Sequence, residues 1–109
     1  MTTEGLTLET KDEADAPKST KRVIASGDID LATAPDFEAY LGELVSQGAL
    51  SIVIDAAGVD FLDSSGIRVL VQASNDLEPL GGNIYLENMS PPVARIMQIT
   101  GLTERYQRP

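Results

Sequence analysis

The chain has 109 residues, a hydrophobic content of 42% and a formal net charge of −9, values that fit one globular domain. The charge argues against nucleic acid and an anionic membrane as partners and favours a protein with a basic face, although acidity that only maintains solubility would explain it equally well. Without cysteine and histidine, the sequence lacks thiolate ligands and the commonest general base. We therefore expect a binding protein rather than an enzyme, with no cofactor and no metal.

The N-terminal residues carry no targeting or membrane signal. Residues 1–10 have no basic region followed by an apolar run, as a signal peptide would. No stretch approaches the roughly 20 apolar residues that span a bilayer. We expect a cytoplasmic protein.

Two short strands are predicted in the N-terminal part. Residues 5–9 include an alternating apolar and polar pattern, and residues 22–26 form a second apolar run. The intervening residues 11–21 are charged and predict a long loop or mobile arm. The two strands would form a hairpin with a long connection, or residues 1–20 would be a mobile tail. Residues 21–109 then hold the remainder of a single domain.

The first helix has the clearest pattern. Thr33 precedes Asp36 by three residues, a variant of the capping box, and Pro35 is tolerated in the first turn. Gly48 would end this helix. Its apolar stripe consists of Phe37, Tyr40, Leu41, Leu44 and Val45.

The second half of the chain alternates strands with helices. Residues 50–54 predict a strand buried on both faces, as in a sheet covered by helices. A helix over 64–77 and a strand over 84–86 follow. Ser90 would cap a third helix that begins with prolines. The order β-β-α-β-α-β-α predicts an α/β fold, with helices packed on a mixed sheet of about four strands.

The stretch from Val59 to Ile67 carries the best candidate site. Phe61 and Leu62 would anchor this loop to the core. Either Asp63 or Ser64 would cap the second helix, which puts the Ser64 hydroxyl in the first turn. Gly66 lacks a side chain, so a neighbouring group can approach closely.

A phosphate on Ser64 could be held at this helix start, where free N–H groups and partial positive charge gather. It adds about −1.5 to −2 charge, which Asp63 would oppose. A partner covering the loop would then bury an unpaired charge, at a cost of about 3–5 kcal/mol. Taken alone, the Asp-Ser-Ser-Gly tetrad is more typical of an ordinary helix cap, because Asp and Ser are the usual capping residues.

Five motifs in order resemble the STAS domain of bacterial anti-sigma factor antagonists over roughly residues 22–103. The motifs are Gly27-Asp28-Ile29-Asp30, Thr33-Ala34, Phe61-Leu62-Asp63-Ser64-Ser65-Gly66, Ser90-Pro91-Pro92-Val93-Ala94-Arg95 and Thr100-Gly101-Leu102. The tetrad after a buried strand is their most specific part. Members of this family usually continue with another strand and a closing helix, which we expect this chain to lack.

The resemblance implies a partner-switching phosphoprotein. Ser64 matches the family's phosphoacceptor. The family's partner is an anti-sigma factor that is also a GHKL-type serine kinase; the unmodified antagonist binds it and frees a sigma factor. Phosphorylation breaks the contact, and a metal-dependent serine phosphatase restores it. The positions implied to contact the partner are Asp30, Thr33, Asp63, Ser65, Gly66 and Ile67.

Several residues keep a second interpretation. Asp30 could instead be a turn residue that caps the first helix, and Ser65 could replace Ser64 as acceptor. Arg68 is expected to be exposed in a surface ion pair. Arg95 is expected on the outer face of the third helix, without a role.

Three other functions remain as alternatives. The same fold could be a subunit of a membrane transport complex in which Ser64 is never modified. A phospho-aspartate receiver using Asp55 would need a lysine after a late strand, and no lysine follows Lys21. A serine hydrolase would need the Gly-x-Ser-x-Gly frame and a histidine, and the sequence has neither.

Overall fold

The protein folds as a mixed five-stranded sheet with three α-helices, and the computed structural model describes residues 1–13 and 16–108. The strands lie in the order β1-β2-β3-β4-β5. β2 pairs antiparallel with both β1 and β3, whereas β4 pairs parallel with both β3 and β5. The elements are β1 (Thr2–Thr3), β2 (Leu6–Asp12), β3 (Thr20–Ile29), α1 (Ala34–Ser46), β4 (Ser51–Leu62), α2 (Ser64–Leu77), a 3-10 turn η1 (Glu78–Leu80), β5 (Asn83–Glu87) and α3 (Pro91–Ile99).

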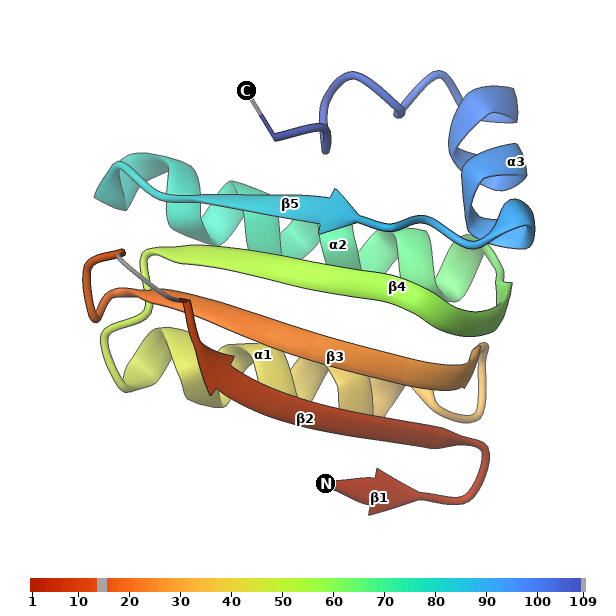
Figure 1. Cartoon of the computed structure of the whole chain (residues 1–109), viewed down its shortest axis with the longest axis horizontal. Coiled ribbons are helices and arrows are strands. Elements are labelled where there is room, and N and C mark those ends of the chain that lie inside the picture. Colours follow the sequence, from red (N-terminus) through yellow and green to blue (C-terminus); the bar gives the residue numbers. More distant parts are fainter. Residues whose placement is uncertain (14–15, 109) are drawn as a thin grey trace.

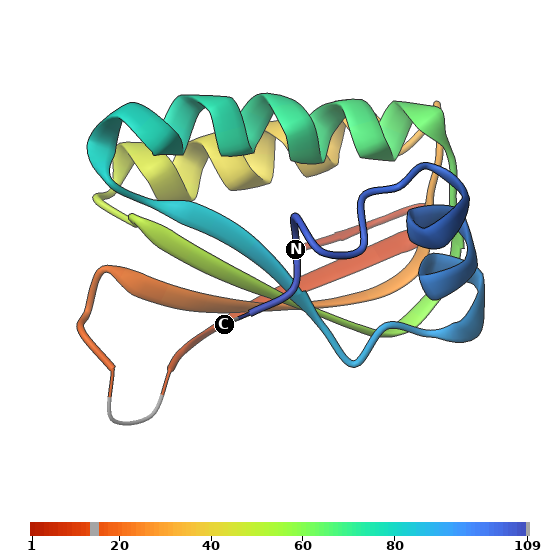
Figure 2. The same cartoon turned by 90° about the horizontal axis from the view of Figure 1, so that it is seen from above.

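Helices α1 and α2 cover the same face of the sheet (Figures 1 and 2). Both connect neighbouring parallel strands, and right-handed crossovers that advance in one direction place their helices on one side. The core lies between these helices and the sheet, and it consists of aliphatic side chains together with Phe37, Met97 and Tyr106. Helix α3 lies beyond the end of β5, at one end of the sheet (Figure 1).

The predicted order of elements is confirmed, but several bounds differ. The sheet has five strands rather than about four, because the two-residue β1 adds to the edge of β2; a strand so short leaves no periodic pattern. β2 reaches Asp12 and β3 begins at Thr20, so the predicted loop over 11–21 is shorter. Ala14 and Asp15 of that loop lie outside the described residues. β4 continues to Leu62, past the predicted end at residue 54.

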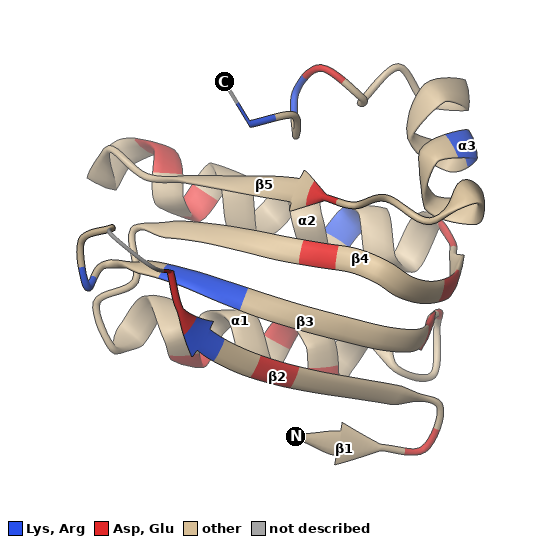
Figure 3. Cartoon of the chain, in the orientation of Figure 1, with Lys and Arg blue, Asp and Glu red and all other residues tan. Residues whose placement is uncertain are grey.

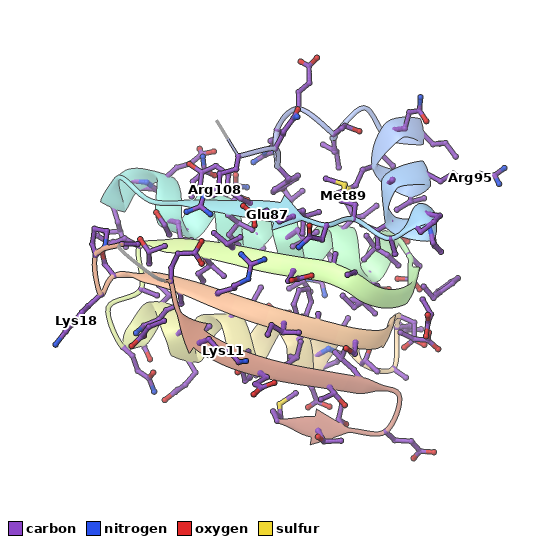
Figure 4. The ribbon with its side chains drawn as sticks, in the orientation of Figure 1. Lys11, Lys18, Glu87, Met89, Arg95 and Arg108 are labelled. Carbon is purple, nitrogen blue, oxygen red and sulfur yellow. The ribbon has the colours of Figure 1, made fainter. Side chains whose placement is uncertain are left out.

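The face of the sheet opposite α1 and α2 carries a network of ion pairs. Arg22 on β3 donates to Glu87 (2.8 Å) and to Asp55 on β4 (3.1 Å). Arg108 donates to Glu13 (2.7 Å) and to Glu87 (3.0 Å; Figure 4). Hydrogen bonds from the two arginines lower the pKa of Glu87. The network therefore ties the C-terminal segment to three strands.

Tyr106 is fully buried (0% exposed) although it lies beyond the last helix. Its carbonyl oxygen accepts a hydrogen bond from the N–H of Leu86 on β5 (2.7 Å), and its hydroxyl lies 3.4 Å from Ser74 Oγ on α2. The segment after α3 thus packs against the edge of the sheet. Within the described residues, no helix combines the length and apolarity required to cross a membrane.

Candidate functional site

The candidate site lies at the end of the sheet where β3, β4 and β5 finish. Parallel strands bring their carboxyl ends to one edge, which is where sites on such sheets form. The β3–α1 loop (30–33) and the acceptor loop, which we define as residues 61–66, lie side by side there, because the N–H of Asp63 donates to the carbonyl of Ile29 (3.2 Å). We refer to this end, which also holds the start of α3, as the docking end (Figure 1, right).

Asp63, rather than Ser64, caps α2. Its Oδ1 accepts hydrogen bonds from the N–H groups of Ser65 (2.8 Å) and Gly66 (3.3 Å). Ser64 is consequently the first residue of the helix and is exposed. Within residues 1–13 and 16–108, its hydroxyl makes no hydrogen bond. The site presents a free hydroxyl on backbone that is fixed by a neighbouring carboxylate.

Gly66 is required by close packing beneath the acceptor loop. A Cβ atom on Gly66 would lie 2.4 Å from Leu62 Cδ1 and 2.6 Å from Ile29 Cγ2. Since Ile29 ends β3 and Leu62 ends β4, the missing side chain lets α2 begin directly against both strand ends. The predicted close approach is confirmed.

Replacing Gly66 by alanine is expected to lower the free energy of unfolding by about 1–2 kcal/mol, since the overlap outweighs the better helix propensity of alanine. Gly42 in α1 is the matched control, because a Cβ atom added to it would meet no other atom within 4 Å. Gly42→Ala should raise the free energy of unfolding by about 0.5–1 kcal/mol. Urea denaturation of both variants checks the opposite signs; equal effects would contradict the packing argument.

Asp30 and Thr33 stabilise the neighbouring loop. Asp30 Oδ1 accepts from the N–H groups of Ala32 (2.9 Å) and Thr33 (3.0 Å), so Asp30 is a turn residue as predicted, but its side chain does not cap α1, which begins at Ala34. The predicted capping box is wrong, because the Thr33 side chain makes no cap hydrogen bond. Its hydroxyl instead donates to the carbonyl of Asp28 (2.8 Å) and accepts from the N–H of Asp30 (3.0 Å).

Two further expectations are corrected by the structure. Phe61 does not anchor the loop in the core: it is 48% exposed, whereas Leu62 is buried. The pairing of β4 with β3 shifts register between Val59 and Phe61, so this end of β4 does not alternate: Val59 and Leu62 are buried and the two residues between them are exposed. Ser90 precedes α3 but makes no cap hydrogen bond, because its hydroxyl donates to the carbonyl of Val59.

The residues implied to contact a partner differ in accessibility. Asp30, Asp63, Ser65 and Ile67 are partly exposed. Thr33 (3% exposed) and Gly66 are buried, so neither residue can offer a surface without rearrangement. In the unbound protein these two positions shape the loops, and their contact with a partner stays a prediction.

Apolar side chains that the sequence analysis missed extend the docking end. Leu31, next to Asp30, and Ile99, at the end of α3, are exposed. Phe61 and Ile99 belong to an open groove beside the acceptor loop. The groove is lined by Phe61, Leu62, Pro92, Arg95, Ile96 and Ile99. Arg95 points away from the body of the fold, as expected for the outer face of α3 (Figure 4).

The loops of the docking end are acidic (Figure 3). Asp28, Asp30, Asp60 and Asp63 all fall within the ends of β3 and β4 or in the loops that follow. Even so, within the described part of the chain no three side chains of the His, Cys, Asp or Glu type could hold a metal ion together. The chemistry offered here is a hydroxyl among carboxylates and apolar groups.

Arg68 lies on α2 one turn beyond Ser64 and forms the predicted surface ion pair. Its Nη2 is 3.7 Å from Glu38 Oε2 on α1. The two side chains are 64% and 49% exposed, so the pair contributes little to stability.

The fold and the acceptor loop define a STAS domain, and the chain belongs to this family: the family model for the STAS domain matches residues 13–107. The anti-sigma-B factor antagonist of Bacillus subtilis (strain 168) is 35% identical over 83 residues, covering 76% of this chain and 75% of that protein. The anti-sigma-B factor antagonist of Staphylococcus epidermidis is 28% identical over 82 residues, covering 75% and 76%.

Solved structures of the same family agree with the fold. An anti-sigma factor antagonist from Mycobacterium paratuberculosis superposes with a TM-score of 0.77 at 28% identity, covering 94% of this chain and 84% of that chain. The unphosphorylated anti-sigma factor antagonist SpoIIAA gives a TM-score of 0.78 at 23% identity, covering 94% and 86%, and bears on the fold alone. The predicted resemblance to anti-sigma factor antagonists is confirmed.

Proposed function

We propose that this protein is an anti-sigma factor antagonist whose docking end binds an anti-sigma factor while Ser64 is unmodified and releases it when Ser64 is phosphorylated. While it is bound to the unmodified antagonist, the anti-sigma factor does not hold its sigma factor. The observation that carries this proposal is the exposed Ser64 hydroxyl, which has no hydrogen-bond partner among the described residues, on a helix start that Asp63 already fixes. Such a hydroxyl can be modified without refolding the domain.

The docking end has the composition of a protein-binding surface. Leu31, Phe61 and Ile99 offer exposed apolar contact around the acceptor loop, and apolar side chains at the centre of an interface supply much of its affinity. Asp30, Asp60 and Asp63 add negative charge beside them. A partner with an apolar centre and basic residues around it would complement this surface.

The switch follows from charge. In the transfer, Ser64 Oγ forms a bond to the γ-phosphorus of ATP, the bond from that phosphorus to the bridging oxygen breaks, ADP leaves, and a base of the kinase takes the hydroxyl proton. The product carries about −1.5 to −2 additional charge next to Asp63. A partner whose apolar centre covers the acceptor loop would have to take that dianion out of water, which costs affinity.

We further propose that the kinase is the anti-sigma factor itself, of the GHKL ATPase type, and that a metal-dependent serine phosphatase regenerates the free hydroxyl. The curated relatives named above are antagonists of anti-sigma-B factors. For the Bacillus cell fate determinant SpoIIAA, a phosphorylated form has been solved. The first observation supports an anti-sigma factor as the partner, and the second supports phosphorylation as the switch; the GHKL type of the kinase and the phosphatase are what the family resemblance implies.

The test is an in-vitro phosphorylation followed by intact-mass measurement. The chain is incubated with ATP and each candidate GHKL-type kinase of its host. We expect a gain of one phosphate group that is absent in Ser64→Ala and retained in Ser65→Ala. Loss of the phosphate in Ser65→Ala alone would move the acceptor to the neighbouring residue. An unmodified mass in every reaction, with an ABC-type ATPase recovered in pull-downs, would replace the proposal by the transport-subunit function.

A further inference from the structure

We propose that Arg68 is the cation that receives the phosphate on Ser64, and that it leaves Glu38 to do so. The inference rests on the proposed function, since it concerns the phosphorylated state of the same site. It goes further by naming a residue that senses the modification and by coupling α2 to α1. Three structural observations lead to it.

The first observation is that the start of α2 has few free N–H groups for a phosphate. Asp63 Oδ1 already accepts from the N–H groups of Ser65 and Gly66. The carbonyl oxygen of Asp63 accepts from the N–H of Ile67 (3.1 Å). The helix start expected from the sequence to hold the phosphate is therefore largely occupied. The dianion needs a different donor.

The second observation is the position of Arg68. Residues four apart on a helix are neighbours on its surface, with Cβ atoms about 5–6 Å apart. Side chains on a helix lean toward its N-terminus, so the Arg68 side chain can reach Ser64, although its guanidinium now lies beside Glu38 on α1. Arg68 is the one cationic residue in the sequence of α2. Ser64 and Arg68 are both exposed, which leaves their side chains free to meet.

The third observation is how weakly Arg68 is held at present. Its contact with Glu38 spans 3.7 Å, beyond hydrogen-bond distance. A guanidinium binds a phosphate through two parallel hydrogen bonds, which a single distant carboxylate oxygen does not offer. A phosphate dianion one turn away therefore competes successfully for Arg68.

The exchange would carry the modification to a second place on the surface. Glu38 lies at the wall of a groove between α1 and α2, together with Gln72 and Asp76. When Arg68 moves to the phosphate, Glu38 loses its countercharge. Phosphorylation then makes the surface around Glu38 on α1 more negative, as well as that of the acceptor loop, without movement of either helix.

Phosphorus NMR of the full-length chain tests the exchange. Phosphoserine is introduced at position 64 by genetic encoding, so that no kinase is needed. The phosphate resonance is then followed over about four pH units, roughly pH 4 to 8, which brackets the second pKa of phosphoserine near 6. Arg68→Gln should raise that pKa by about 0.15–0.4 of a unit. Arg68→Lys should restore part of the difference. Glu38→Gln should lower the pKa, because Arg68 is no longer shared.

The control removes a charge of the same sign elsewhere. Arg105 pairs with Glu78 at the other end of α2, and Arg105→Gln should leave the titration unchanged. Asp30, Asp60 and Asp63 are present in every variant, so differences report the arginine alone. An identical pKa in the parent and Arg68→Gln would overturn the inference while leaving the Ser64 switch intact. Failure of every kinase to modify Ser64 would instead contradict the proposed function. The two failures are distinguishable, because the NMR experiment uses no kinase.

Discussion

Replacing Ser64 by aspartate is expected to weaken binding of the anti-sigma factor by about 100-fold or more. The variant places a carboxylate where the partner would cover it, next to Asp63, and a buried charge without a partner costs about 3–5 kcal/mol. The fold should tolerate the change, because acidic side chains are favoured in the first turn of a helix. Isothermal titration with the purified partner measures the loss, and circular dichroism checks the fold.

Two variants separate the effect of place from that of charge. Ser64→Ala removes the acceptor without adding charge and should bind as the parent protein does. Ser46→Asp makes the same chemical change away from the docking end, because α1 begins at that end and Ser46 is its last residue. The Ser46→Asp variant should also bind normally. An affinity of Ser64→Asp equal to that of Ser46→Asp would rule out a charge-operated contact at the acceptor loop.

Replacing Tyr106 by alanine is expected to give the largest loss of stability, about 3–5 kcal/mol. Tyr106 is fully buried, and its segment forms a main-chain hydrogen bond to Leu86. For a domain of this size, such a loss lowers the unfolding temperature by about 12 °C or more. Differential scanning calorimetry measures the shift.

Tyr106→Phe is the matched control for this prediction. It keeps the buried ring and loses the hydroxyl, whose contact with Ser74 Oγ is long at 3.4 Å. The unfolding temperature should therefore fall by no more than a few degrees, equivalent to about 1 kcal/mol. If the alanine and phenylalanine variants unfold at the same temperature as the parent, the C-terminal segment does not contribute packing energy.

The parts of the fold that could be predicted are those encoded locally. The apolar stripe of α1 and the buried runs of β4 and β5 are read from neighbouring residues, and they lead directly to the α/β order. The ends of the strands are harder to predict from the sequence, because pairing with β5 rather than local composition keeps Asp55 inside β4. The buried position of Tyr106 depends on contacts with residues distant in the chain, which no local pattern reveals.

The candidate site shows the same division. The exposed position of Ser64 and the close approach at Gly66 follow from the tetrad itself. The roles of Thr33 and Ser90 could not be predicted, since a hydroxyl near a helix start can cap the helix or bond to another strand. Ser90 takes the second option with the carbonyl of Val59, 31 residues earlier.

The two edges of the sheet bear on how another protein can associate with this one. β1 pairs with the start of β2, and the carbonyl of Tyr106 occupies the N–H of Leu86 on β5. Partial cover of both edges limits β-augmentation, in which a guest chain extends the sheet through main-chain hydrogen bonds. Recognition then depends on the side chains at the carboxyl ends of the strands. There a single phosphate group can change which partner binds.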